Sequence, residues 1–305
     1  MGKIAFLFAG QGAQYTGMGQ SLYEVSPAAR RVLEMADPIR PATSKQCFEG
    51  SAEELSVTLN TQPCLFCVDL AAAEALKEAG ITPDGVAGFS LGEVAALTFT
   101  GSFSAEKGFE LVCERAALMH EASEASRSGM VAILKLAPEK VEKVCKQVGD
   151  SYPINFNCPG QIVAATLRDR SDELIAAVKQ AGGRALALPV SGGFHSPFMQ
   201  SAYEGLQKAL KHYAFAQPVV PVYANSTAAP YPTPDKQLLS EQLIRPVYWQ
   251  KTLENMAADG YDTFVEVGAG KTLSGFVKKT LPNTTIVNVQ DAESLAAALA
   301  VLRGE

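Results

Sequence analysis

The segment "GVAGFSLGEVAAL" contains a serine whose neighbours could make it a nucleophile. Gly88-Phe89-Ser90-Leu91-Gly92 stands between a short apolar run and a helical pattern, which is the G-x-S-x-G arrangement. Its glycines permit a tight strand-to-helix turn that exposes the serine hydroxyl, and the following helix directs N–H groups at developing negative charge. We predict a nucleophilic Ser90; the alternative is an ordinary helix start with Ser90 as the N-cap.

A nucleophilic serine needs a base, and the chain has three histidines. His120 falls inside a predicted helix, where we expect it to face solvent, and His212 closes an amphipathic helix as a cation in its last turn. His195 follows an apolar run in "LPVSGGFHSPFM" and precedes a turn into a helix, a placement that displays catalytic side chains. We therefore predict His195 as the base; a structural loop histidine is the alternative.

The glycine-rich stretch "GQGAQYTGMG", residues 10–19, follows the apolar run 4–8 and raises the possibility of a nucleotide site. The dinucleotide fingerprint requires a third glycine where Tyr15 stands, and no acidic residue ends a second strand about 20 residues later. The later "GAGKT" lacks the P-loop spacing, because Val265 occupies the position that needs glycine. Neither stretch therefore predicts a phosphate site.

Composition limits the class of protein. With 305 residues, 47% of them hydrophobic and 19% charged, the chain can form one large domain that carries a smaller insertion. The net charge of −6 disfavours nucleic-acid binding through the overall field. No apolar run approaches the roughly 20 residues of a membrane span, and the start of the chain lacks a signal-peptide pattern. We expect a cytoplasmic protein with no nucleic-acid or membrane partner.

The six cysteines are scattered through apolar segments, which favours reduced, buried thiols over a disulfide framework. Cys64 and Cys67 form a C-x-x-C pair at the expected start of a buried helix. A second pair and a nearby histidine are missing from the sequence, so we expect structural thiols and no metal site.

Short apolar runs alternate with helical patterns, which predicts an α/β fold with a parallel sheet. We expect strands at 3–8, 85–90, 218–225, 262–268 and 284–289, and helices at 28–36, 63–79, 91–98, 105–125, 198–212 and 247–259. Residues 129–190 change to the β-α-β-β-α-β order of a ferredoxin-like unit. The proline-rich segment 225–237 is expected to be an exposed loop.

Seven motifs occur in an order that resembles a known enzyme family. They are "FAGQGAQYTGMG", "GFSLGEVAAL", "LVCERAALMHEA", "INFNCPGQIV", "SGGFHSPFM", "QLIRPVYW" and "EVGAGKTLSG". Together they resemble the malonyl-CoA:acyl carrier protein transacylases of type II fatty acid synthesis, over nearly the whole chain. The acyltransferase domains of polyketide synthases share this pattern and remain an alternative.

The resemblance and the alternating elements together imply an α/β fold class with two lobes. We expect a large α/β-hydrolase-like lobe with a parallel sheet core and an inserted ferredoxin-like small lobe, with the active site in the cleft between them. The expected boundaries are 1–127 for the first part of the large lobe, 128–192 for the small lobe and 193–305 for the second part of the large lobe.

The resemblance also implies roles for individual residues. By position in the motifs, Ser90 is the nucleophile and His195 its general base, and the main-chain carbonyl of Gln242 orients the histidine. The family pattern implies an oxyanion hole made by the backbone N–H groups of Gln11 and Leu91. A carbonyl in place of a triad carboxylate suits this chain, because no Asp or Glu has a conspicuous triad setting.

Substrate contacts follow from the same resemblance. Arg115 is implied to bind the free malonyl carboxylate through its planar guanidinium, although composition alone would make it a solvated helix arginine. Asn157 is implied to line the cleft, and the bulk of Phe194 to disfavour an α-methyl branch. Phe89 departs from the family, which commonly has histidine at that position.

The implied activity is transfer of the malonyl group from malonyl-CoA to the phosphopantetheine thiol of acyl carrier protein, through a malonyl-serine intermediate. This chemistry calls for no metal and for no cofactor beyond malonyl-CoA as donor substrate. A serine thioesterase or esterase shares the G-x-S-x-G turn, and an inactive docking subunit would share the fold. We further expect a monomer that meets its acidic carrier protein through a local basic rim.

Overall fold

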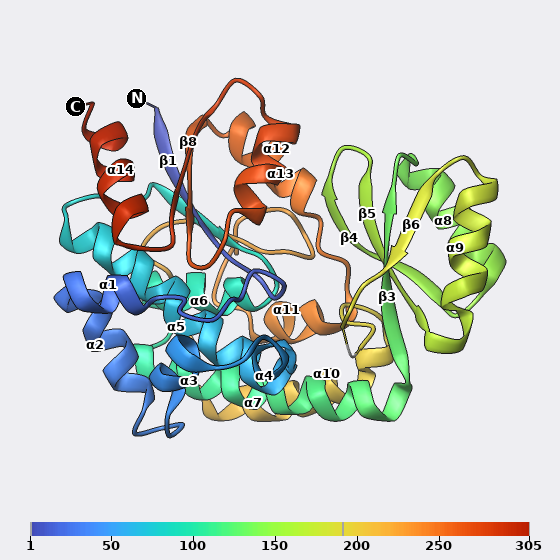
Figure 1. Ribbon diagram of the computed structural model, residues 1–305, viewed down its shortest axis with the longest axis horizontal. Coiled ribbons are helices and arrows are strands. Elements are labelled where there is room, and N and C mark those ends of the chain that lie inside the picture. Colours follow the sequence, from blue (N-terminus) through green and yellow to red (C-terminus); the bar gives the residue numbers. More distant parts are fainter. Residues whose placement is uncertain (1, 191, 305) are drawn as a thin grey trace.

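The computed structural model describes residues 2–190 and 192–304, which form two lobes, each built around its own sheet (Figure 1). Ser191 of the "SGGFHSPFM" motif lies outside the described residues. The large lobe holds a five-stranded parallel sheet in the order β7-β2-β1-β8-β9. Its strands are β1 (Lys3–Phe8), β2 (Gly85–Gly88), β7 (Val222–Tyr223), β8 (Tyr261–Val267) and β9 (Thr285–Val289).

Helices cover both faces of this sheet, which explains why β1 is apolar at almost every position. Phe6 and Phe8 pack into the core formed with α5 (Thr58–Glu78), α6 (Leu91–Phe99) and α7 (Ala105–Ser126). Ala5 and Leu7 point the other way, into the core formed with α12 (Trp249–Ala258) and α13 (Thr272–Thr280). The alternation of side chains along one strand thus stabilises two helical layers.

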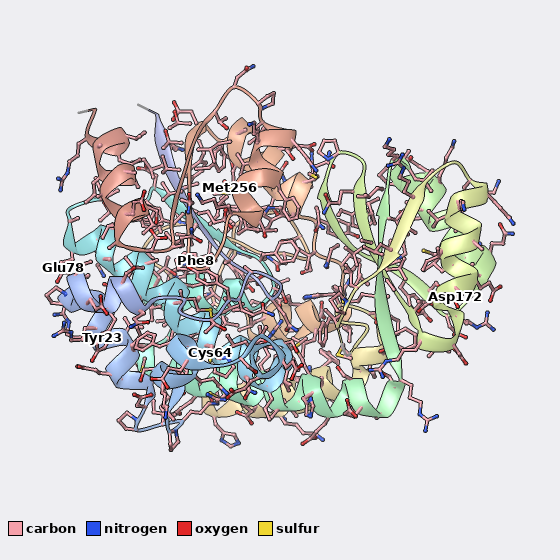
Figure 2. The ribbon with its side chains drawn as sticks, viewed as in Figure 1. Phe8, Tyr23, Cys64, Glu78, Asp172 and Met256 are labelled. Atoms are coloured by element: carbon pink, nitrogen blue, oxygen red, sulfur yellow. The ribbon has the colours of Figure 1, made fainter. Side chains whose placement is uncertain are left out.

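Further helices surround this three-layer core. Those of the large lobe are α1 (Gln20–Val25), α2 (Pro27–Ala36), α3 (Thr43–Glu49), α4 (Ala52–Ser56), α10 (Gln200–Ala209), α11 (Lys236–Glu241) and α14 (Ala292–Arg303), with the short 3₁₀ turns η2 (Pro197–Met199), η3 (Leu210–His212) and η4 (Gln242–Ile244). Phe8 and Cys64 lie inside this lobe, whereas Glu78 lies at its margin (Figure 2). None of the helices in the described ranges combines the length and apolarity that a membrane span requires.

The small lobe has the strand order β4-β5-β3-β6 with every neighbouring pair antiparallel, which confirms the predicted ferredoxin-like topology. Its elements are β3 (Ser128–Leu134), α8 (Pro138–Val148), β4 (Ser151–Cys158), β5 (Gln161–Leu167), the 3₁₀ turn η1 (Arg168–Arg170), α9 (Ser171–Gln180) and β6 (Arg184–Ala187). Helices α8 and α9 bury one face of the sheet, while the other face is turned towards the large lobe (Figure 1).

Backbone pairing joins the two lobes near Val247. The Val247 N–H donates to the carbonyl of Ile154 at 2.7 Å, and the Phe156 N–H donates to the carbonyl of Val247 at 2.9 Å. Tyr248 stacks on Phe156 with ring centroids 5.2 Å apart. The segment before α12 is therefore an added edge to the small sheet, which holds the lobes in a defined register. The domain boundaries at 127/128 and 192/193 stay a prediction.

Several expected elements differ from the observed ones. Helix α5 begins at Thr58, so Pro63 lies inside the helix and was the wrong start. The expected strand at 218–225 contracts to Val222–Tyr223, because Pro218 and Pro221 have no N–H to donate to a ladder. The helices α1, α3, α4, α11, α13 and α14 were not predicted, although the capping box at Asp291 is a sequence signal for the start of α14.

The segment 225–237 is exposed only in part, at positions such as Pro230, Pro232 and Thr233, whereas its proline content indicated an exposed loop throughout. Asn225 is fully buried, and Tyr231 is 5% exposed. The loop therefore turns back into the protein at these two positions, next to the candidate site.

Candidate active site

Ser90 lies on a sharp turn between β2 and α6, with φ 56° and ψ −106°. A Cβ atom at Gly88 would collide with the backbone of Gly92, and one at Gly92 would collide with the carbonyl of Phe8. The two glycines of the G-x-S-x-G pattern are therefore required by sterics, as the elbow interpretation predicts. The Ser90 side chain makes no capping hydrogen bond to α6, so the alternative of an ordinary N-cap is wrong.

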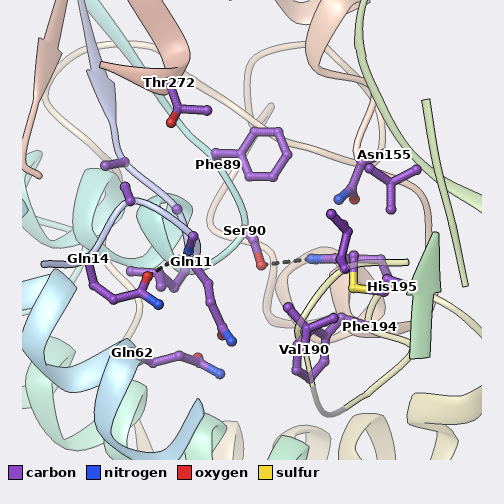
Figure 3. Close-up of a pocket in the computed structure, with 18 of the residues that line it drawn as sticks. Gln11, Gln14, Gln62, Phe89, Ser90, Asn155, Val190, Phe194, His195 and Thr272 are labelled. Atoms are coloured by element: carbon purple, nitrogen blue, oxygen red, sulfur yellow. Dashed lines mark hydrogen bonds between the residues drawn. The ribbon is translucent and has the colours of Figure 1, made fainter. Parts of the chain in front are cut away.

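The Ser90 hydroxyl meets His195 across the cleft (Figure 3). Its Oγ lies 2.7 Å from His195 Nε2, and Nδ1 of the same ring lies 2.8 Å from the main-chain carbonyl of Gln242. A carbonyl only accepts, so Nδ1 carries the proton and Nε2 is left as the acceptor for the serine O–H. This tautomer is the one that a general base needs.

Burial sets the protonation state of that base. His195 is 3% exposed, and desolvation together with the positive charge of Arg115 lowers its pKa from 6.5 to about 4. Hydrogen bonding to the backbone acts weakly in the opposite direction. The imidazole is therefore neutral at physiological pH, ready to accept the serine proton.

Arg115 is 1% exposed on α7, so the solvated helix arginine that composition indicated is wrong. Its Nη2 donates to Ser90 Oγ at 3.1 Å and to Gln242 Oε1 at 2.8 Å, while Nη1 donates to Gln62 Oε1. Burial lowers the pKa of Arg115 to about 10, which leaves it charged at neutral pH. Its Nε has no hydrogen-bond partner among the described residues.

These groups face a pocket of about 490 Å³ between the two lobes. The wall formed by the small lobe, α7 and the segment before His195 is largely apolar, with Met119, Met130, Val163, Leu188 and Phe194. Phe194 is 6% exposed and stands directly before His195. A mostly apolar cavity of this size with a few convergent polar groups is typical of a small-molecule site.

Two asparagines of β4 contribute polar groups to the same pocket. Asn157, the predicted cleft residue, and Asn155, which the sequence analysis did not single out, both line it. Their side-chain carbonyl oxygens are buried and have no partner among the described residues. Buried acceptors of this kind are costly unless a ligand donor reaches them.

Gln11 and Leu91 line the pocket beside Ser90. Leu91 is the first residue of α6, where a helix leaves its N–H groups without partners in the helix. The side chain of Gln11 accepts a hydrogen bond from Thr58 Oγ1 at 2.9 Å, and Thr58 accepts one from Gln62 Nε2 at 3.0 Å. Because Gln62 also binds Arg115, a chain of side chains links the glycine-rich loop to the guanidinium.

Asn225 holds the strained turn in place from the far side, a role that sequence reasoning missed. Its Oδ1 accepts the Ser90 N–H at 2.8 Å, and its Nδ2 donates to the carbonyl of Gly88 at 2.6 Å. These bonds cross 135 and 137 positions of the chain. Their only sequence signal was an asparagine at the end of a short apolar run.

Among the remaining residues that the sequence analysis discussed, Phe89 lines the pocket, whereas His120, His212 and the cysteines do not. Phe89 packs against Trp249 and Phe276, with ring centroids 5.3 and 6.3 Å apart, so the elbow has an aromatic wall at the position where the family commonly has histidine. His212 is exposed, and His120 is half-buried rather than solvated. The six cysteines are free thiols, and no group of three potential metal ligands occurs within residues 2–190 and 192–304.

Comparison with known proteins shows the family of the chain. The protein-family model named acyl transferase domain matches residues 5–300, so the chain belongs to the acyl transferase domain family. It is 40% identical over 313 residues to the malonyl CoA-acyl carrier protein transacylase of Bacillus subtilis (strain 168), a match that covers 100% of this chain and 99% of the relative. The corresponding enzyme of Escherichia coli (strain K12) is 34% identical over 307 residues, with 98% and 99% covered.

Solved structures share the fold as well. The malonyl CoA-acyl carrier protein transacylase of Clostridium perfringens superposes with a TM-score of 0.95 at 35% identity, over 99% of this chain and 98% of that one. A malonyl-transacylase solved in complex with a type II PKS acyl-carrier protein gives a TM-score of 0.94 at 31% identity, over 99% and 100%. These matches confirm the family resemblance drawn from the seven motifs and the two-lobe fold class.

Proposed function

We propose that this protein is an [acyl-carrier-protein] S-malonyltransferase, which moves the malonyl group from malonyl-CoA to the phosphopantetheine thiol of acyl carrier protein in fatty acid biosynthesis. The observation that carries the proposal is the convergence of Ser90, His195 and Arg115 in the pocket, with Ser90 Oγ 2.7 Å from the imidazole and 3.1 Å from the guanidinium. Relatives of this name match over nearly the whole chain and support the substrate class.

In the first half-reaction, Ser90 Oγ attacks the thioester carbon of malonyl-CoA while its proton passes to His195 Nε2. The N–H groups of Gln11 and Leu91 donate to the oxyanion of the tetrahedral intermediate. The C–S bond then breaks, and the imidazolium returns its proton to the departing coenzyme A thiolate. The product is a malonyl ester on Ser90 with His195 neutral again.

The second half-reaction runs the same steps with the carrier protein as nucleophile. The phosphopantetheine thiol gives its proton to His195 and attacks the ester carbon, and collapse of the intermediate returns the proton to Ser90 Oγ. The malonyl group leaves as a thioester of the carrier protein. Because both halves use the same base and the same oxyanion donors, no metal or further cofactor is needed in this scheme.

Selection of the acyl group is assigned to Arg115 and Phe194. The malonyl carboxylate can take hydrogen bonds from the buried guanidinium, whereas an acetyl group would leave that charge without an anionic ligand. Phe194 reduces the room beside His195 in the pocket, which disfavours a methyl branch on the acyl chain. We assign Asn157 a contact with the substrate, because this residue lines the pocket and its side-chain oxygen Oδ1 is buried without a hydrogen-bond partner among the described residues.

A second candidate is a discrete acyltransferase of a polyketide synthase. It is favoured by the likeness to the malonyl-transacylase that was solved with a type II PKS acyl-carrier protein. The chemistry at Ser90 is the same, and only the carrier protein differs. In either case we propose a monomer that works in the cytoplasm, with malonyl-CoA and acyl carrier protein as its partners.

The test is acyl transfer with purified components. Incubation with malonyl-CoA should add the mass of one malonyl group to the intact protein, and addition of holo-acyl carrier protein should remove it. Ser90→Ala should block this adduct, while Ser226→Ala, a partly exposed serine on the loop after β7, should not. A malonyl adduct on the Ser90→Ala protein, or rapid hydrolysis of malonyl-CoA without any acceptor thiol, would refute the assignment.

A further inference from the structure

Behind Ser90, on the first turn of α6, lies a carboxylate that the mechanism above does not use. Glu93 is 1% exposed, and it is not among the residues that line the pocket between the two lobes. Its Oε2 accepts the Asn225 N–H at 2.8 Å and Gln242 Nε2 at 3.0 Å, and its Oε1 accepts the hydroxyl of Tyr231. A buried carboxylate is costly unless it is hydrogen-bonded in this way, so its presence indicates a specific role.

Gln242 connects this carboxylate to the reacting groups. Its Nε2 donates to Glu93 and also to the Ser90 carbonyl at 3.0 Å, while its Oε1 accepts from Arg115 Nη2 at 2.8 Å. Its main-chain carbonyl accepts from His195 Nδ1 at 2.8 Å. One residue therefore contacts the elbow, the base and the arginine at the same time.

The orientation of the Gln242 amide follows from the charges at its two ends. A carboxylate accepts hydrogen bonds and a guanidinium donates them, so the NH₂ must face Glu93 and the oxygen must face Arg115. A flipped amide would set oxygen against carboxylate and NH₂ against guanidinium, and both contacts would be repulsive. Without the negative charge of Glu93, the preference for the observed orientation is weaker.

We propose that Glu93 is a positioning residue for acyl transfer, whose carboxylate fixes the side-chain amide of Gln242 and, through that amide, the Arg115 guanidinium that receives the acyl group's carboxylate. This inference rests on the proposed malonyl transfer. It assigns Glu93 no contact with substrate. It requires instead that the effect of Glu93 on selectivity pass through Gln242.

A double-mutant cycle tests this route, because coupling between two residues appears as non-additive losses. The variants are Glu93→Gln, which keeps the shape and removes the charge, Gln242→Met, which removes the amide and keeps the main-chain carbonyl, and the pair together. The readout is the ratio of kcat/KM for malonyl-CoA to kcat/KM for acetyl-CoA. A loss of stability affects both substrates equally and leaves this ratio unchanged.

We expect each single variant to lower the ratio at least tenfold and the double variant to lower it no further than the worse single one. Asp69→Asn is the control for altering a buried acidic side chain, because Asp69 is fully buried on α5 and its side-chain oxygens have no hydrogen-bond partner among the described residues. Its ratio should stay within twofold of the parent protein. Multiplicative losses in the double variant, or an unchanged ratio in Glu93→Gln, would overturn the proposal.

Three further outcomes are distinguishable. If Glu93→Gln does not fold, Gln242→Met alone carries the test, since an unchanged ratio in that variant contradicts any route through the amide. If the parent protein forms no malonyl-serine, the proposed function fails. If the parent protein transfers malonyl and the variants keep its selectivity, only the role of Glu93 fails.

Discussion

Replacement of Arg115 by methionine is the most direct test of how the pocket distinguishes a malonyl group from an acetyl group. Methionine roughly keeps the volume of the buried side chain and removes its charge and its donors, so the core of α7 is disturbed less than by alanine. The guanidinium loses its bonds to Ser90, Gln242 and Gln62. Those losses affect the elbow with any substrate, whereas the loss of the carboxylate partner affects malonyl alone.

The size of the malonyl-specific effect follows from burial. Arg115 is 1% exposed, so a carboxylate that binds it does so out of contact with water. Removing one partner of a buried, hydrogen-bonded charge pair costs about 2–5 kcal/mol. At about 1.4 kcal/mol for each factor of ten, the ratio of kcat/KM for malonyl-CoA to that for acetyl-CoA should fall roughly 30- to 5,000-fold.

The assay measures transfer from malonyl-CoA and from acetyl-CoA to purified holo-acyl carrier protein, with Arg115→Met, Arg115→Lys and the parent protein. Lysine keeps a charge without the planar fork, so its ratio should lie between the other two. Arg31→Met removes an exposed guanidinium on α2 and serves as the control, with no expected change. Equal losses for malonyl and acetyl in Arg115→Met would show that the guanidinium does not bind the carboxylate.

Three further outcomes are expected. Because burial and Arg115 lower the pKa of His195 to about 4, the rate of malonyl-serine formation should stay constant as pH falls to about 5 and decline only near 4. Arg115→Met removes a positive neighbour of His195 and should move that decline to higher pH. A decline near the ordinary histidine pKa in the parent protein would contradict the pKa shift. Phe194→Ala should raise the ratio of methylmalonyl to malonyl transfer roughly 5- to 150-fold in a competition assay, since one methyl group in a pocket is worth about 1–3 kcal/mol. An unchanged ratio would show that Phe194 does not select against the methyl branch. Asn225→Ala removes the side chain that binds the Ser90 N–H and the Gly88 carbonyl. The free energy of unfolding in urea should therefore fall by about 2 kcal/mol or more, and malonyl-serine formation should slow. A variant as stable and as fast as the parent would show that the turn at Ser90 keeps its shape without Asn225.

Local patterns in the sequence were sufficient for the nucleophile and its turn. The steric demand on Gly88 comes from the backbone of Gly92 in the same turn, so a five-residue pattern between a strand and a helix already contains it, whereas the demand on Gly92 comes from the backbone of Phe8 on β1. The ferredoxin-like unit was also predictable, because the hydrophobic periodicity of the sequence indicates each of its strands and helices in turn. His195 was reached by elimination among three histidines and by its place after an apolar run.

Arg115, Glu93 and Asn225 could not be placed in the same way. On helix periodicity Arg115 resembles many exposed arginines, and only the family resemblance marked it. Asn225 and Tyr231 stand in a segment whose prolines predicted exposure, yet both are buried because Glu93 offers them a partner. Burial of a polar side chain depends on what faces it, and that information lies on another element.

The linear order of residues was therefore enough to predict the main strands, the long helices and the turn that displays a strained serine, because backbone sterics and side-chain periodicity act over a few residues. Which side chains meet at the pocket depended on contacts between distant parts of the chain. His195 and Ser90 are 105 positions apart, and Arg115 and Gln242 are 127 apart. Pairing of β2 with β1 and β7 brings Ser90 and Asn225 together at the end of the large sheet, and hydrogen bonds from α7, η4 and the segment before η2 gather Arg115, Gln242 and His195 around Ser90. Desolvation there gives the imidazole and the guanidinium their shifted pKa values.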